Sequence, residues 1–405
     1  MHHKQLALAV AISLGFASFT AAAAPASSTN SANADATADE IAQLKAQLVQ
    51  LQNQVAQLEQ RTDAQSDINV STQQNVEALQ SKETTIDKLD KLVNDTKLSG
   101  TMYTDFTNID QTKNGAKTAS SGTGLDVKRF YLSVDHKFND IWSANLTTDF
   151  NYSSIDGETQ VFVKKAYLQG TFAPLATLRV GSANMPWIPY VEDWYGYRFV
   201  ENTLIDRTKF GNSADWGLHL LGDNGTFNYQ ASVVNGGGYK NPTRTNSVDF
   251  EGRAGFTPFK GFVVAVGGYS GDLGKDTNTS PALHDAHRYD ALVAYNANNL
   301  RLGAEYFKAN NWNNVVTPAT DSADGYSLWG SYDFGPAALF ARYDRVKTSK
   351  DLDPSLKDTY YNLGVAFPVT KGVRVAVAYK NDELKDDTKI DTKTREFGAW
   401  GEVKF

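Results

Sequence analysis

The sequence predicts an all-β transmembrane barrel of about sixteen antiparallel strands, preceded by an α-helical coiled-coil segment. Three observations carry this prediction. After Lys97 apolar residues recur at every second position, short and long polar connections alternate along the same region, and the last residue is the aromatic Phe405. Strands of this kind average to neutral hydropathy, which agrees with a mean hydropathy of −0.42 in a chain that is 12% aromatic.

The composition excludes several classes of protein. The 405 residues contain no cysteine, which excludes a disulfide scaffold, a thiolate metal site and a cysteine nucleophile. A formal net charge of −7 argues against a nucleic-acid partner, because a phosphate-binding surface carries a net basic patch. Beyond the N-terminal region no apolar run reaches the roughly 18 residues of a membrane-spanning helix, so a helical membrane protein is excluded.

Residues 1–23 have the features of a secretory signal peptide. A weakly basic start is followed by the apolar run Leu6–Phe19 and by the small residues Ala21–Ala23 that a signal peptidase requires. The apolar run is too short to cross a membrane as a helix, which disfavours a transmembrane anchor. Residues 24–38 are rich in Ala, Ser, Asn and Thr and predict a flexible linker. We therefore expect export to the outer membrane of a Gram-negative bacterium.

Residues 39–95 predict a coiled coil on the periplasmic side of the membrane. The two apolar heptad positions are occupied by Ile41, Leu48 and Val55 and by Leu44, Leu51 and Leu58. This spacing forms one seam along a helix face, as knobs-into-holes packing requires. The alternative is a single amphipathic helix that lies on the next domain. The seam does not choose between two and three strands.

Residues 97–405 predict the barrel itself. Alternation is clear in runs such as Phe130–Val134 and Val373–Tyr379, and the single apolar face of each run would also suit a soluble sandwich. The connections favour the barrel, because tight turns near 138–140 and 223–225 alternate with long polar segments, the pattern of periplasmic turns and extracellular loops. The final strand is similar to the signal read by the barrel-assembly machinery, which makes that machinery an expected partner of Phe405.

Basic side chains at the inward positions of the strands are expected to line the lumen. Spaced guanidinium groups could conduct anions through successive weak contacts. They could instead form ion pairs with acids on neighbouring strands, in which case they would only stabilise the water-exposed wall. The expected lumen-wall residues are Arg129, Lys165, Arg179, Arg253, Arg301, Arg342 and Arg374.

The segment 184–212 is the longest expected loop, and it is unusually aromatic. Its aromatic residues are Trp187, Tyr190, Trp194, Tyr195, Tyr197 and Phe199. So much aromatic surface must pack against something, and the barrel interior is the available surface. We expect the loop to fold inward and narrow the pore. A flap that packs on itself or on a neighbouring subunit is the alternative.

Several motifs resemble the phosphate-selective porin O/P family. They are Arg129–Val134, Lys165–Gln169, Leu178–Gly181 followed by Met185–Trp187, and Tyr197–Glu201. The resemblance implies sixteen strands, a trimer, and an anion path lined with Arg and Lys at a constriction in the third loop. Matching basic positions in this loop are Arg198, Arg207 and Lys209, whereas the acids Glu192, Asp193, Glu201 and Asp206 depart from the family's pattern.

The predicted pore constriction consists of Trp187, Glu192, Asp193, Tyr197, Arg198, Arg207 and Lys209. We expect Arg198→Ala and Arg207→Ala each to shift selectivity toward cations more than Arg374→Ala does. If Glu192 and Asp193 neutralise the two arginines, the substitutions would instead change mainly the stability of the loop.

No enzyme motif is present, so we expect no catalytic residue, no metal and no cofactor. The first hypothesis for function is an outer-membrane porin, a homotrimer in outer-membrane lipid, through which small hydrophilic solutes or anions diffuse passively. A sugar or peptide uptake channel is a rival within the same class. A structural tether, in which the barrel anchors a coiled-coil arm, is a rival of a different class.

Overall fold

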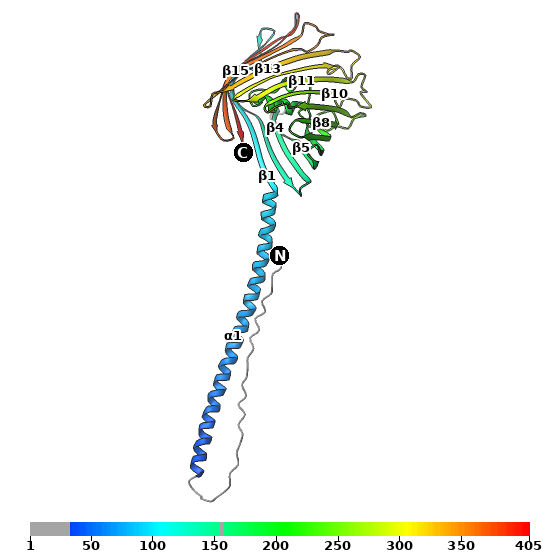
Figure 1. Ribbon diagram of the computed structural model, residues 1–405. Coiled ribbons are helices and arrows are strands. Elements are labelled where there is room, and N and C mark those ends of the chain that lie inside the picture. Colours follow the sequence, from blue (N-terminus) through cyan, green and yellow to red (C-terminus); the bar gives the residue numbers. More distant parts are fainter. Residues whose placement is uncertain (1–32, 154–157) are drawn as a thin grey trace. The chain divides into compact units, whose positions relative to one another are not determined.

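The structure, a computed structural model, describes residues 33–153 and 158–405 (Figure 1). The expected signal peptide 1–23 and residues 24–32 of the expected linker lie outside the described residues. Contacts divide the chain into two units, one ending at Asp87 and the other spanning Lys88–Phe405. Helix α1 (Asn33–Asp95) covers the expected coiled coil and begins several residues before it. Within the described ranges, no helix is both long enough and apolar enough to cross a membrane.

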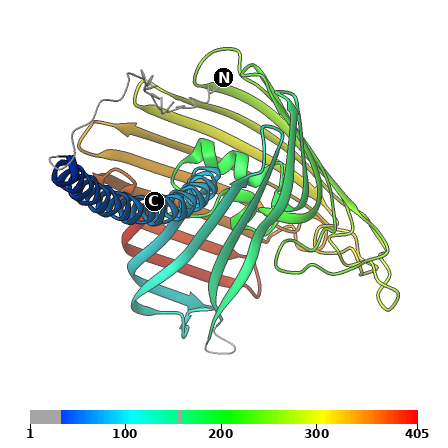
Figure 2. The same ribbon diagram turned by 90° about the horizontal axis from the view of Figure 1, so that it is seen from below.

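A single antiparallel sheet, closed on itself, makes up the second unit and confirms the predicted barrel. Each strand pairs with its neighbours in the sequence, and pairing of β1 with β17 closes the ring (Figure 2). Sixteen strands form the wall. A seventeenth, β2 (Ala116–Lys117), is a two-residue extension of the first hairpin.

The wall strands are β1 (Thr96–Lys113), β3 (Gly122–Lys137), β4 (Trp142–Ser153), β5 (Glu158–Ala173), β6 (Ala176–Asn184), β7 (Ala214–Asp223), β8 (Phe227–Val234), β9 (Asp249–Phe256), β10 (Phe262–Gly271), β11 (Ala286–Ala297), β12 (Leu300–Asn310), β13 (Ser322–Asp333), β14 (Ala338–Lys347), β15 (Lys357–Thr370), β16 (Val373–Lys385) and β17 (Asp391–Lys404).

The two faces of the wall are chemically opposite. In β14, Leu339, Ala341 and Tyr343 are exposed on the outer face, whereas Arg342 and Asp344 are buried on the inner face. The same alternation, with apolar residues outward and polar residues inward, runs through the other strands and is typical of a barrel in lipid. The inner face therefore supplies the charges that can act on a solute.

Two β-bulges add basic residues to the inner face. Tyr103 pairs with Arg129 and the next residue pairs with Val127, which leaves Lys128 as an extra residue in β3. Lys164 is likewise the extra residue in β5, because Thr147 pairs with Lys165 and Thr148 pairs with Val163. A bulge interrupts the strict alternation of side chains. The side chains of two consecutive basic residues, Lys128 with Arg129 and Lys164 with Lys165, can therefore point to the same face of the wall.

Candidate functional site: the lumen around the third loop

The connection between β6 and β7 folds into two short helices. Helix α2 (Ile188–Tyr195) begins at a proline-containing first turn and ends at Gly196, whose positive φ of 77° is the left-handed conformation that glycine adopts most readily. Helix α3 (Leu204–Arg207) follows. The apolar side of α2 is buried, and the helix lies against β11 and β12 inside the ring of strands (Figure 2). The loop thus packs on the inner wall.

Trp187 anchors the start of this loop on two wall carboxylates. Its side chain is fully buried, and its indole Nε1 donates a hydrogen bond of 2.8 Å to Oε1 of Glu305. Its backbone N–H donates a hydrogen bond of 3.0 Å to Oε1 of Glu251. Trp187 therefore attaches the loop to the wall, whereas the sequence led us to expect it at the surface of the constriction.

We expect Trp187→Phe to destabilise the loop's attachment by about 1–3 kcal/mol, because it leaves the buried Glu305 carboxylate without its donor. Urea unfolding of the full-length protein in detergent measures the loss. Trp400→Phe is the matched control, since Trp400 is fully buried and its indole nitrogen has no hydrogen-bond partner in the described part of the chain. Equal losses in the two variants would contradict the role of the Glu305 hydrogen bond.

Tyr197 is a second anchor rather than an open pore side chain. Its ring stacks on Phe340 with 4.4 Å between centroids, and only 6% of the residue is exposed. Phe199 is fully buried beside it, and the Arg374 guanidinium lies 4.5 Å from the Phe199 ring. The aromatic residues of the loop are therefore used mainly in packing against the wall.

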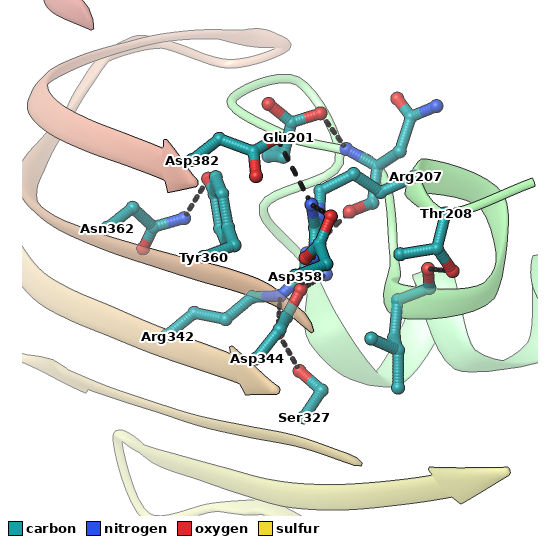
Figure 3. Close-up of polar contacts among 12 residues, drawn as sticks. Glu201, Arg207, Thr208, Ser327, Arg342, Asp344, Asp358, Tyr360, Asn362 and Asp382 are labelled. Carbon is teal, nitrogen blue, oxygen red and sulfur yellow. Dashed lines mark hydrogen bonds and ion pairs between the residues drawn. The ribbon is translucent and has the colours of Figure 1, made fainter. Parts of the chain in front are cut away.

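Arg207 ties α3 to three strands at once (Figure 3). Its guanidinium lies 3.1 Å from Asp344, 2.6 Å from Asp358 and 3.2 Å from Asp382, on β14, β15 and β16 respectively. The side chain is 7% exposed. Asp344 also pairs with Arg342 at 2.7 Å and accepts a hydrogen bond from Ser327. Arg207 is thus neutralised by wall acids, not by the loop acids considered in the sequence.

Arg198 occupies a different position, at the open side of the loop. It pairs with Glu192 at 2.5 Å and with Asp206 at 3.3 Å, and its guanidinium carbon lies 6.0 Å from the centre of the Tyr103 ring. Burial opposes the charge on Arg198, but Glu192, Tyr131 and Asp206 together outweigh it and raise the pKa of Arg198. Arg198 therefore stays charged, with one carboxylate more than it can neutralise.

The other loop residues expected at the constriction have separate environments. The backbone carbonyl of Asp193 accepts a hydrogen bond of 3.0 Å from Arg301, and burial raises the pKa of the Asp193 carboxyl. Lys209 is exposed, and its backbone carbonyl accepts a hydrogen bond from Trp312. Glu201 pairs with Lys380 at 3.0 Å. Burial alone would raise the pKa of Glu201, but Lys380 and Lys128 lower it.

The expected wall cations divide into two groups. Four of them, including Arg374, hold the loop. Arg253 donates to the Pro186 carbonyl, Arg301 to the Trp194 carbonyl, and Arg342 to the Asn202 carbonyl. Arg374 pairs with Glu402 at 2.6 Å and donates to the Gly196 carbonyl.

The second group lies on the opposite wall. Arg129 is 4.0 Å from Asp149, and Arg179 donates to Gln169 at 2.8 Å. Lys165 is opposite Thr147, a buried inward residue. This wall also carries Lys128 and Lys164, which the sequence reasoning missed because the period-two pattern has no place for a bulge.

Three cavities meet at Arg198. It lines a cavity of about 180 Å³ with Arg129, Lys164 and Lys240. It also lines one of about 480 Å³ with Asp105 and Lys128, and one of about 340 Å³ with Arg374 and Lys404.

A closed barrel with an apolar outer face, a charged inner wall and cavities along that wall is typical of membrane pores. Residues 64–387 match the family described as Gram-negative porin, which covers more than half of the chain, so the chain belongs to this family. Family and fold support a channel in the outer membrane rather than an enzyme.

Solved porin structures share the fold at low sequence identity. The anion-selective porin from Comamonas acidovorans is similar with a TM-score of 0.54 and 12% identity, over 76% of this chain and 99% of that chain. Salmonella typhi OmpF in complex with daunomycin is similar with a TM-score of 0.53 and 14% identity, over 76% and 97%. The trimer form of Vibrio cholerae OmpT has a TM-score of 0.50 and 16% identity, over 76% and 99%. Comparison with curated proteins found no match.

Proposed function

We propose that this porin passes small hydrophilic solutes by passive diffusion, and that residues 185–213 form its constriction. The observation that carries the proposal is the position of Arg198, which lines three cavities on the open side of an inward-packed loop. A solute that moves between these cavities would pass the charged group formed by Arg198, Glu192 and Asp206. In the narrow, partly dehydrated passage, that group and the basic residues of the facing wall would together determine selectivity.

We further propose a preference for anions, phosphate among them. The loop covers carboxylates on one side of the lumen, since Arg207 pairs with three aspartates and Trp187 contacts Glu251 and Glu305. On the other side, Lys164 and Lys240 have no carboxylate within 4.0 Å among the residues described, and each lies over a tyrosine ring instead. The accessible wall would therefore have an excess of positive charge.

The test is ion conduction by the purified full-length protein in planar bilayers. We expect discrete current steps, and in a potassium chloride gradient a reversal potential of the sign that anion preference requires. A cation-preferring reversal potential would contradict the anion proposal alone. A silent barrel would contradict the channel itself.

The pH dependence of selectivity tests the role of Asp206. Burial raises the pKa of the Asp206 carboxyl, and the nearby Arg198 does not cancel that effect. Asp206 is therefore charged above its raised pKa and becomes neutral as the pH falls through it. We expect the reversal potential to shift toward anions as the pH is lowered from neutral, while Asp206→Asn already shows that shift at neutral pH. A pH dependence unchanged in Asp206→Asn would assign the titration to another group.

An uptake channel for sugars or peptides is less well supported by the same contacts. A sugar path would need aromatic rings exposed to the lumen, yet Trp187, Tyr195 and Phe199 are buried against the wall.

We also propose that the chain assembles as a homotrimer with the coiled coil in the periplasm. In the single chain the seam of α1 is exposed, for example 62% at Leu44 and 60% at Leu51, which leaves it free to pair with copies of itself. The solved trimer form of OmpT is a relative in fold with that assembly.

The same exposed seam favours the tether as a second function, and strong peptidoglycan binding by a non-conducting barrel would support it. Phe405 pairs with Gly100 of β1, and we propose it as the signal for barrel assembly.

A further inference from the structure

The outer face of the barrel carries a row of lysines at the long-loop end. Lys308, Asp324, Lys347, Lys357 and Lys385 are directly opposite one another in register on β12 to β16. The residues beside Lys347 and Lys357 in the sequence point the other way, since Val346 is fully buried and Asp358 pairs with Arg207 in the lumen. The row therefore faces the lipid.

The lysine side chains of this row repel one another. Lys347 is opposite Lys357, and Lys357 is opposite Lys385, and like charges directly opposite on neighbouring strands destabilise a sheet. Asp324, the one acid of the row, forms an ion pair with Lys350 of the adjoining loop. Across the described residues, no carboxylate lies within 4.0 Å of the ammonium groups of Lys308, Lys347 or Lys357.

The neighbouring part of the same rim is organised differently. On β16, β17 and β1 the outward charges alternate in sign and form pairs, namely Glu383 with Lys393 at 3.5 Å, Lys385 with Asp391 at 3.6 Å, and Asp110 with Arg395 at 3.9 Å. Between these two neighbouring sectors, the unpaired positive charge thus lies on β12–β15. Solubility alone does not explain why the lysines of one sector lack ion-pair partners while the charges of the neighbouring sector are paired.

The depth of the row matches that of lipid headgroups. Exposed tyrosines lie one or two outward positions nearer the middle of the strands, and Tyr326 and Tyr343 contact each other with 6.2 Å between ring centroids. Aromatic belts of this kind lie at the membrane–water interface. Lys347 is four residues beyond Tyr343, which at about 3.4 Å per residue on a tilted strand places it about 10 Å further out.

We propose that the surface formed by Lys308, Arg345, Lys347 and Lys357 binds the phosphate groups of a phosphorylated glycolipid in the outer leaflet of the membrane. Each phosphate would accept charge-assisted hydrogen bonds from two lysines on adjacent strands and remove their mutual repulsion. Arg345, which donates to the Thr359 hydroxyl, lies one outward position below Lys347 and is held at the same surface. The proposal rests on the proposed function, in which the coiled coil lies in the periplasm and the long loops therefore lie on the outer side of the membrane.

The test measures binding of fluorescent diphosphorylated lipid A to the full-length protein in nonionic detergent. We expect the double variant Lys347→Gln/Lys357→Gln to bind at least about tenfold more weakly at low salt, because two charge-assisted contacts are lost, and to show a weaker salt dependence. Lys393→Gln is the matched control, since it removes a positive charge from the same rim but one that is already paired with Glu383. It should change the affinity by less than about twofold.

A second measurement separates lipid binding from folding. Without lipid A the double variant should melt at the same temperature as the wild type or higher, because repulsion is relieved, and with lipid A it should melt lower than the wild type. Equal weakening by Lys393→Gln, unchanged affinity in the double variant, equal binding of the dephosphorylated lipid, or displacement of lipid A by millimolar inorganic phosphate would each overturn the proposal. Conductance of the same preparations is recorded in parallel, so that a barrel that binds lipid A but carries no current fails only the proposed function.

Discussion

Arg207→Ala is expected to release the third loop from the wall. The substitution removes the cation that Asp344, Asp358 and Asp382 share, and Asp358 and Asp382 form no other ion pair among the described residues. Removing one partner of a buried ion pair costs about 3–5 kcal/mol. We expect larger and noisier single-channel currents, because the detached loop no longer narrows the pore.

The effect of Arg207→Ala can be separated from a simple change of charge. Lys209→Ala, two residues further along, removes an exposed cation from the same loop and should leave the current steps unchanged. Adding Asp358→Asn and Asp382→Asn to Arg207→Ala should restore quiet currents. The neutral amides leave no unpaired carboxylate charge at these two positions once the guanidinium is absent. A quiet channel with wild-type conductance in Arg207→Ala would show that the apolar contacts of Trp187 and Tyr197 hold the loop without this network.

Arg198→Ala is expected to make the charge at the constriction more negative. It leaves Glu192 and Asp206 without the guanidinium that pairs with both, on the side of the loop that faces the cavities. A unit charge at about 10 Å through an effective dielectric constant of about 20 is worth about 1.7 kcal/mol, or roughly a tenfold change in permeability ratio. We expect a shift toward cations of this order in the reversal potential.

Three controls define this prediction. Arg198→Lys keeps the charge and should keep most of the selectivity, whereas adding Glu192→Gln to Arg198→Ala should recover it. Arg374→Ala removes a cation that Glu402 already neutralises and whose side chain is 33% exposed, so its shift should be smaller. Equal, small shifts in Arg198→Ala and Arg374→Ala would eliminate residues 185–213 as the selective constriction.

The local pattern of the sequence was sufficient to predict the barrel. Alternation of apolar and polar residues after Lys97 is a property of each strand by itself, and the alternation of short and long connections orders the strands without knowledge of their contacts. The aromatic content of residues 184–212 likewise predicted burial of that segment, because exposed aromatic surface is unfavourable in water. The same information identified Arg198 and Arg207 as the notable cations of the loop.

Only the tertiary structure decided what those cations do. Arg207 and its three aspartates are separated by 137 to 175 residues, and their meeting depends on the register of three strands and on the fold of the loop. Arg198, nine residues earlier, instead faces the cavities with Glu192 and Asp206. Two bulges add Lys128 and Lys164 to the basic wall, and no periodic pattern contains them. Alternation is local and can be read from the chain, whereas a charge acquires its role from partners that folding brings within a few ångströms of it.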